Sequence, residues 1–293
     1  MKNPTIKPHA IKRVDKVIYH RKSQLKRTLS HDSVISEQPL SINLHWHLKD
    51  DNVETKVFAI TMRTLGDDNF LILGLLFSEG IIRNVSDVEC IYLDEINEQS
   101  NQNTWHVLLI KGMEPKLTSI ERFQTTYSSC GLCGATSLQA LELKEPPNLV
   151  SLSQNFKINA DLLFSLTDNM RDQQSLFALT GGVHGAALFD KDGKLINVFE
   201  DIGRHNAVDK LIGHCLFNKL LNTTNQSLTM VVSGRVSFEI VQKVVMAGIC
   251  ILVSVGAPSD LAIKAAQRFD LTLIGFVTSS SFNVYCGDWR VNA

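Results

Sequence analysis

The sequence has no apolar run long enough to cross a membrane. Its longest runs, residues 70–77 and 244–255, fall well short of the roughly 20 residues that a spanning helix needs. No apolar stretch follows the basic N-terminus, so no secretory signal is expected. The net charge is only −1, which excludes nucleic-acid binding through the overall charge of the chain. With 44% hydrophobic residues among 293, we expect a soluble, cytoplasmic protein with one large or two modest cores, and no membrane or nucleic-acid partner.

Cysteines are few, and only one pair is close in sequence. The six are Cys90, Cys130, Cys133, Cys215, Cys250 and Cys286. In a reducing cytosol they remain thiols, so the lone C-x-x-C at residues 130–133 indicates redox chemistry, metal binding or sulfur handling rather than a disulfide framework. Cys215 and Cys250 lie within apolar patterns, which predicts that both are small core residues.

Composition divides the chain into three parts. Nine of the first 27 residues are Lys or Arg against a single acid, Asp15, and we predict that residues 1–36 form a basic flexible tail. The alternative is an arm that touches a partner or nucleic acid. Residues 37–145 are predicted to form a mixed α+β domain that holds the C-x-x-C loop. A Pro-Pro turn then leads into an α/β domain over residues 146–293.

Hydrophobic periodicity predicts the elements of the first domain. Apolar and polar residues alternate over residues 40–48, which predicts a strand with one buried face, and residues 53–61 supply its hairpin partner. Residues 70–77 are apolar almost all round and lie between two acids and a glycine, which is typical of a buried helix. Further strands are predicted at residues 88–94 and 104–110.

The second domain alternates strands with helices. Predicted strands lie at residues 195–199, 228–232, 249–255 and 271–277, and predicted helices at residues 161–170, 206–221, 237–247 and 261–269. Continuous β-branched runs between amphipathic helices are typical of parallel strands that are covered on both faces. We therefore predict a mostly parallel sheet with flanking helices.

Three loops of the second domain follow predicted strands and combine glycine with polar residues. They are residues 200–206, 233–235 and 256–260, and they contain Arg204, His205, Ser233, Gly234 and Arg235. Ligands of open α/β sheets bind outside the carboxyl ends of the strands, and Arg can clamp a phosphate with two hydrogen bonds. Each loop alone is more typical of a tight turn, but together they favour a site for a phosphorylated or nucleotide-like ligand. Another glycine-rich turn carries His184, either a general acid or base or a structural residue.

The C-x-x-C loop has the features of a reactive thiol. Cys130 and Cys133 are each followed by glycine, and a helix is expected to begin just after them, which lowers the pKa of a thiol through the helix dipole. A structural zinc site needs four ligands, which distant residues such as Cys90 or Cys286 would have to complete. The βαβ context of a thioredoxin-like pair is missing. A zinc deaminase needs H-x-E upstream and a proline before the first cysteine, and this sequence has neither.

Several long motifs, all in the same order, carry a resemblance to a known family. They are Thr61-Met62-Arg63-Thr64 with Gly66-Asp67-Asp68, Ser128-Ser129-Cys130-Gly131-Leu132-Cys133-Gly134, Thr180-Gly181-Gly182-Val183-His184, Asp201-Ile202-Gly203-Arg204-His205-Asn206-Ala207-Val208-Asp209-Lys210, Ser233-Gly234-Arg235 and Gly256-Ala257-Pro258-Ser259. With them the chain resembles the formate dehydrogenase accessory sulfurtransferase family (FdhD) from about residue 37 to the C-terminus. Leu65 stands where the family usually has proline, which implies a local change of turn.

The resemblance implies a sulfurtransferase that acts through a cysteine persulfide. Family members take persulfide sulfur from a cysteine desulfurase and deliver it to the molybdenum (or tungsten) bis-pterin guanine dinucleotide cofactor of formate dehydrogenase. Cys130 would be the carrier and Cys133 an auxiliary or resolving thiol. The resemblance also implies a cytidine-deaminase-like core, a homodimer and no permanently bound metal.

The same resemblance implies which residues bind the cofactor. Family members use the final stretch, here Phe276, Val277, Thr278, Ser279, Ser280 and Ser281, together with the loops that hold Arg204, His205, Ser233, Gly234 and Arg235. The family typically has a basic residue in the final stretch, whereas this chain is serine-rich and uncharged there. Two other functions stay open: a zinc-dependent hydrolase of deaminase-like fold, and a cofactor chaperone that never handles sulfur.

Overall fold

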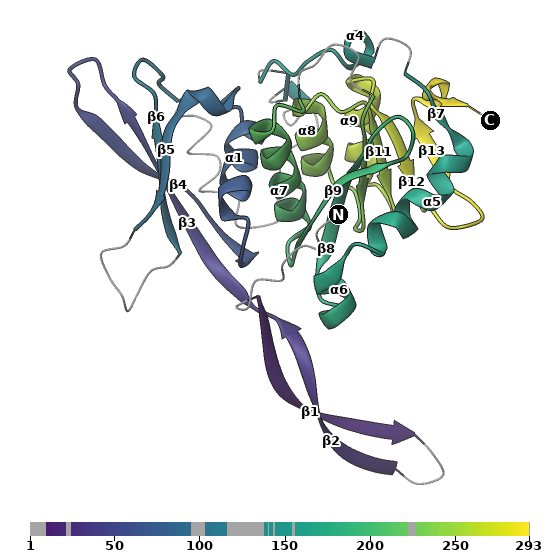
Figure 1. The fold of residues 1–293 in the computed structure, drawn as a ribbon. Helices are drawn as coiled ribbons and strands as arrows, with labels where there is room; N and C mark the ends of the chain where they lie inside the picture. Colours follow the sequence, from purple (N-terminus) through teal and green to yellow (C-terminus); the bar gives the residue numbers. More distant parts are fainter. Residues whose placement is uncertain are drawn as a thin grey trace.

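The computed structural model describes residues 10–21, 25–94, 103–115, 138–139, 141–142, 144–153, 156–221 and 227–292. Figure 1 shows three parts: a two-stranded ribbon, a four-stranded sheet and a six-stranded sheet, with helices between the two larger sheets. Among the described residues no helix is both long and apolar enough to cross a membrane.

The four-stranded sheet follows the sequence pattern closely. Its elements are β3 (Glu37–His47), β4 (Val53–Thr64), β5 (Val88–Leu93) and β6 (Thr104–Leu109), in the order β4-β3-β6-β5, with the short η1 (Val85–Asp87) before β5. The predicted alternation is confirmed, because Leu40, Ile42 and Leu44 are fully buried on one face of β3. The predicted buried helix is α1 (Asp68–Ser78), whose residues from Leu71 to Ser78 are all buried.

The six-stranded sheet is mixed, which corrects the prediction of a mostly parallel sheet. Its strands are β8 (His184–Phe189), β9 (Leu195–Asp201), β10 (Thr229–Val232), β11 (Ile251–Ser254), β12 (Thr272–Gly275) and β13 (Asn283–Cys286), in the order β13-β12-β11-β10-β8-β9. Only β10–β11 and β11–β12 are parallel pairs. The unpredicted β8 lies antiparallel between β10 and β9, and its sequence, rich in glycine and alanine, lacks the β-branched residues that mark the other strands.

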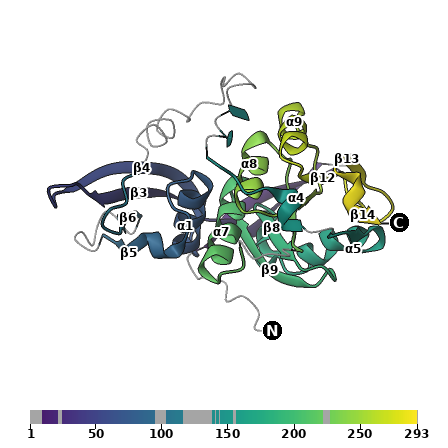
Figure 2. The same cartoon turned by 90° about the horizontal axis from the view of Figure 1, so that it is seen from above.

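Helices cover both faces of this sheet. They are α5 (Ala160–Arg171), α6 (Ser175–Thr180), α7 (Arg204–Phe217), α8 (Phe238–Met246) and α9 (Asp260–Arg268). Figure 2 shows α7, α8 and α9 side by side on one face, with α5 on the other. Short elements complete the described chain: α4 (Leu149–Ser153), β7 (Ile158–Asn159), η2 (Asp288–Arg290) and β14 (Val291–Asn292), the last paired in parallel with β7.

The two larger sheets share one hydrophobic core through the contact between α1 and α7. The helices cross so closely that a Cβ added at Gly74 would collide with the carbonyl oxygen of Asp209, and one at Gly213 would collide with that of Phe70. Glycine therefore permits backbone contact at this crossing.

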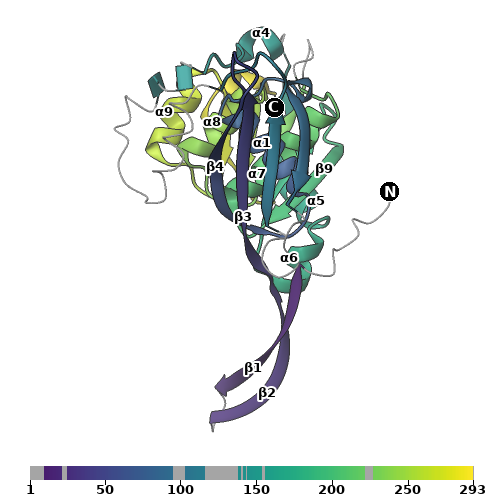
Figure 3. The ribbon, with the colours of Figure 1, turned by 90° about the vertical axis from the view of Figure 1, so that its left-hand side faces the viewer.

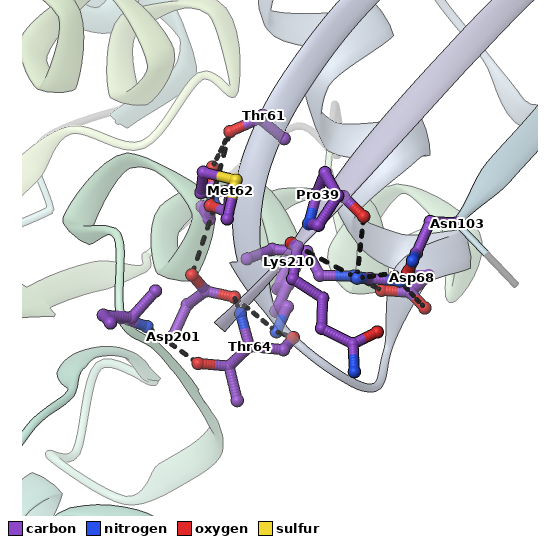
Figure 4. Close-up of polar contacts among 12 residues, drawn as sticks. Pro39, Thr61, Met62, Thr64, Asp68, Asn103, Asp201 and Lys210 are labelled. Atoms are coloured by element: carbon purple, nitrogen blue, oxygen red, sulfur yellow. Dashed lines mark hydrogen bonds and ion pairs between the residues drawn. The ribbon is translucent and has the colours of Figure 1, made fainter. Parts of the chain in front are cut away.

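The buried Arg63 fixes the end of the β3–β4 hairpin. Its Nε donates to Asp68 Oδ1 at 3.0 Å. Its Nη1 donates to the carbonyl oxygen of Pro39 at 3.0 Å and to Asn103 Oδ1 at 2.9 Å, as Figure 4 shows around the labelled partners. A fully buried guanidinium is tolerated here because these acceptors satisfy its donors.

Residues 1–36 were predicted to form a flexible tail, and the structure corrects this over the part that it describes. The ribbon consists of β1 (Ile11–Arg21) and β2 (Leu25–Ile35), paired antiparallel along their whole length. It projects away from both larger sheets (Figures 1 and 3). Its strands are joined by their own cross-strand pairs, such as Val17 opposite Leu29 and the 2.8 Å ion pair of Lys16 with Asp32, and β2 contacts α6.

Candidate functional site

The polar loops of the second domain lie at one edge of the six-stranded sheet. Strands β9, β10, β11 and β12 all end there, and β8 begins there, because His184 lies opposite Asp201 and Ala186 lies opposite Val232. The loops after β10 and β11 contact each other, since the backbone N–H of Val236 donates to the carbonyl oxygen of Ala257 at 3.1 Å. This edge is the candidate site.

A cavity of about 510 Å³ opens at this edge. Its walls come from α5, α6 and the loops, and they include the following residues: Asp168, Arg171, Gln174, Phe177, Gly182, His184, Ser233, Val277 and Thr278. Gln174 is buried, and its Nε2 has no hydrogen-bond partner among the described residues. The sequence predicted the helix α5 but did not single out its cavity-lining residues, because periodicity alone does not show which polar face a cavity will use.

Two arginines and two histidines give the edge its electrostatic character. Burial and the nearby Arg204 and Arg235 guanidinium groups lower the pKa of His184. Burial, Lys243 and Arg204 lower the pKa of His205 to about 4, and its Nε2 lies 3.1 Å from Ser237 Oγ. Both imidazoles are therefore neutral near pH 7.

One hydrogen-bond donor of Arg204 is available to a ligand. Its Nε is buried and has no hydrogen-bond partner among the residues that the structure describes. Gly234 lies against it, because a Cβ at this position would approach Arg204 Cδ to 3.6 Å and His184 Nδ1 to 3.2 Å. A buried guanidinium donor beside a glycine loop fits an anionic oxygen, as in a phosphate.

Ser233 is tied to the neighbouring strand. Its backbone N–H donates to the carbonyl oxygen of Gly185 at 3.0 Å, and its Oγ accepts from the Gly185 N–H at 2.9 Å. Its Oγ also lies 3.5 Å from His184 Nδ1. The structure thus brings Ser233 and His184 together, which the sequence did not predict.

The predicted cofactor stretch, residues 276–281, divides into two parts. Val277 and Thr278 line the cavity. The remaining serines form an exposed turn that closes on itself: Thr278 Oγ1 accepts from the N–H groups of Ser280 and Ser281 at 3.3 and 3.0 Å. The hydroxyls of Ser280 and Ser281 also lie within hydrogen-bond distance of Thr278 Oγ1, at 3.4 and 3.3 Å, so the polar groups of this turn mainly contact one another.

The cysteines fall into clear classes. Cys130 and Cys133 lie outside the described residues. The prediction that Cys215 and Cys250 are core residues is confirmed, and burial raises the pKa of Cys215 to about 12. Cys90 is exposed and Cys286 is half-buried. Within the described ranges no group of three or more His, Cys, Asp or Glu side chains is arranged to hold a metal ion.

Comparison with known proteins agrees with the resemblance. The chain matches the FdhD/NarQ family over residues 35–292. It is 43% identical over 263 residues to the sulfur carrier protein FdhD of Streptomyces coelicolor, which covers 89% of each chain. It is 39% identical over 260 residues to the sulfur carrier protein FdhD of Sulfurisphaera tokodaii, which covers 89% of this chain and 92% of that one.

A solved structure shares the fold. The crystal structure of a candidate formate dehydrogenase accessory protein from Desulfotalea psychrophila matches with a TM-score of 0.69 and 22% identity, covering 96% of this chain and 99% of that one. Sequence and fold therefore agree over nearly the whole chain, and the chain belongs to the FdhD/NarQ family.

Proposed function

We propose that this chain is a sulfur carrier that supports the maturation of a formate dehydrogenase. The observation that carries the proposal is the match to relatives named sulfur carrier protein along nearly the full length of both chains. The proposal includes a cytoplasmic location, which rests on the sequence composition. It also includes a cysteine desulfurase as sulfur donor, a homodimeric state and a core related to cytidine deaminases, which rest on the family resemblance.

The working thiol of the proposal is Cys130. Its thiolate attacks the sulfane sulfur of a persulfide on the desulfurase, so that a new S–S bond forms on Cys130. The S–S bond of the donor breaks at the same time, and the donor cysteine leaves as a thiolate. Cys133, three residues later, acts as the auxiliary or resolving thiol.

The cargo of the proposal is the molybdenum bis-pterin guanine dinucleotide cofactor, bound as a client rather than kept as a resident group. Its phosphates would lie against Arg204, His205, Ser233, Gly234 and Arg235, with residues 276–281 beside them. The unpartnered buried Nε of Arg204, among the described residues, supports this assignment, because a phosphate oxygen would complete it. The neutral His205 adds a hydrogen-bonding group without further charge.

Intact mass spectrometry tests the sulfur-carrier proposal. The protein is incubated with an active cysteine desulfurase and L-cysteine, as wild type, Cys130→Ala and Cys90→Ser. A gain of about 32 Da that a reductant removes is expected in the wild type and in Cys90→Ser, but not in Cys130→Ala. Cys90→Ser is the matched control, because Cys90 is the exposed cysteine among the described residues. Absence of the gain from all three proteins would leave a cofactor chaperone that does not handle sulfur.

A further inference from the structure

Asp201, the last residue of β9, accepts hydrogen bonds from both the four-stranded-sheet region and the six-stranded-sheet region. Its side chain is fully buried, and its Oδ2 accepts from the backbone N–H of Thr64 at 3.1 Å and pairs with Lys210 Nζ at 2.7 Å. Its Oδ1 accepts from the N–H of Gly203 at 2.9 Å and from Asn206 Nδ2 at 3.1 Å (Figure 4).

Further hydrogen bonds join the end of β4 to this turn and to helix α7. Asn206 Nδ2 donates to the carbonyl oxygen of Met62 at 2.8 Å, and Lys210 Nζ donates to that of Thr64 at 3.0 Å. The backbone N–H of Ile202 donates to Thr64 Oγ1 at 3.0 Å. Figure 4 shows these contacts around Asp201, Thr64 and Lys210. The end of the four-stranded sheet thus holds the loop at the ligand edge of the six-stranded sheet.

The carboxylate of Asp201 also fixes the start of helix α7. Helix α7 begins after Gly203, which has no side chain to satisfy the first N–H groups. Asp201 accepts the N–H of Gly203 itself and orients Asn206 one turn into the helix. The residues between these two anchors are Arg204 and His205, so the direction in which both side chains leave the backbone depends on this carboxylate.

We propose that Asp201 is a positioning residue for the ligand edge: through Thr64, Gly203, Asn206 and Lys210, it holds Arg204 and His205 against the phosphates of a guanine nucleotide. The inference rests on the proposed function for the identity of the ligand. It assigns Asp201 no contact with the ligand, and it makes the junction between the two sheets a determinant of affinity.

A second buried pair in the chain supplies a matched control. Asp209 lies within α7, and Lys243 Nζ lies 2.8 and 2.9 Å from its two carboxylate oxygens. Ser78 Oγ donates to the same carboxylate at 3.1 Å. This pair has the same charges and similar burial, but it contacts α1 and α8 rather than the turn that carries Arg204. Loss of Asp209 should therefore cost stability without moving Arg204, although it leaves Lys243, which lowers the pKa of His205, without its carboxylate partner.

The experiment measures GDP binding to the full-length protein by calorimetry, together with the melting temperature. We expect Asp201→Asn to weaken GDP binding about tenfold, because Arg204 loses its fixed direction, and Asp209→Asn to change it by less than about twofold. Both variants should melt at lower temperature than the wild type. Hydrogen exchange at the amides of residues 202–205 should speed up in Asp201→Asn alone.

A double variant separates a loss of GDP binding from a loss of folding. Asp201→Asn combined with Lys210→Met removes both charges, so it should melt above Asp201→Asn while GDP binding stays weak. The inference is overturned if folded Asp201→Asn binds GDP as the wild type does, or if Asp209→Asn loses as much affinity. If the wild type itself does not bind GDP, the phosphate-binding part of the proposed function fails. The positioning role is tested separately: equal hydrogen exchange at residues 202–205 in Asp201→Asn and Asp209→Asn would overturn it.

Discussion

The four-stranded sheet and the six-stranded sheet keep their polar side chains in different places. On the open face of the four-stranded sheet they lie in mid-strand: His45 is hydrogen-bonded to Thr55 at 2.7 Å and to His106 at 2.8 Å. In the six-stranded sheet, β10 and β11 are buried along their whole length, and the charged groups lie where strands end. A sheet covered on both faces leaves its strand ends as the place for ligand chemistry. The outer face of the four-stranded sheet instead mixes polar side chains with exposed apolar ones such as Val57 and Ile60.

The four-stranded sheet therefore mainly stabilises the fold, and the six-stranded sheet carries the ligand edge, although both share one core. Four predictions test this division, and they begin with the helix crossing on which both regions depend.

The largest effect is expected from Gly74→Ala at the α1–α7 crossing. The added methyl group collides with the backbone of Asp209, so the helices must move apart, and we expect a loss of about 3 kcal/mol or more in the free energy of unfolding. Urea denaturation measures this loss. Gly182→Ala is the control, because its nearest neighbouring atom would be 3.7 Å away, and it should cost no more than about 0.5 kcal/mol. Two separate unfolding transitions, with only one shifted, would show that the regions fold independently.

Arg63→Met should destabilise the fold without changing the site directly. It leaves Asp68 without its guanidinium partner and removes the donor to Pro39, so we expect a loss of about 3 kcal/mol in urea denaturation. GDP affinity, measured by calorimetry below the melting temperature, should fall by less than the tenfold loss expected of Asp201→Asn, since Thr64, the next residue along β4, can still reach Asp201 through its backbone. A tenfold loss of affinity would mean that the four-stranded sheet shapes the ligand edge more strongly than the division allows.

Acidification should weaken the fold through His205. Its pKa is lowered to about 4, so between pH 6.5 and 4 the unfolded chain binds a proton that the folded protein excludes. Stability therefore falls as the pH falls through this window, with His205 contributing up to about 3 kcal/mol of the loss. His205→Gln should flatten the pH dependence measured by urea denaturation. His45→Gln, in the four-stranded sheet, should flatten it less, although burial and His106 also lower the pKa of His45.

Arg204→Met should affect binding more than stability. The loss of one charge-assisted bond should weaken GDP binding about tenfold, near 1.4 kcal/mol, while the free energy of unfolding changes by less than about 1 kcal/mol. Arg83→Met is the control, since Arg83 pairs with Glu145 at an exposed position and should leave binding unchanged. Equal affinities for wild type and Arg204→Met would remove Arg204 from the proposed ligand site.

The parts of the fold that sequence predicted well are those with strong local patterns. Alternation over residues 40–48 and the apolar run at residues 70–77 predicted β3 and α1 with their buried faces. The missed parts have weak or misleading patterns. Glycine and alanine make up half of strand β8, and the ribbon is so basic that its charge suggested a solvated tail.

The candidate site was predictable only in part, for a different reason. Loops after strands identified Arg204 and Ser233, because the order of strands in a sheet brings their ends together. The contact between Asp201 and Thr64 could not be predicted from strand order. Thr64 lies 137 residues earlier in the sequence and contacts Asp201 through its backbone. Both residues lie inside motifs that the sequence displays, yet local pattern carries no information about such a long-range pair.

The buried thiols of Cys215 and Cys250 have a consequence for chemical labelling. Burial raises the pKa of both, so at neutral pH the native protein keeps them as thiols that alkylating reagents attack slowly. Label uptake by a Cys90→Ser, Cys286→Ser double variant would then report on Cys130 and Cys133 alone. Unfolding the same variant should add two further labels, which supplies an internal standard for the count.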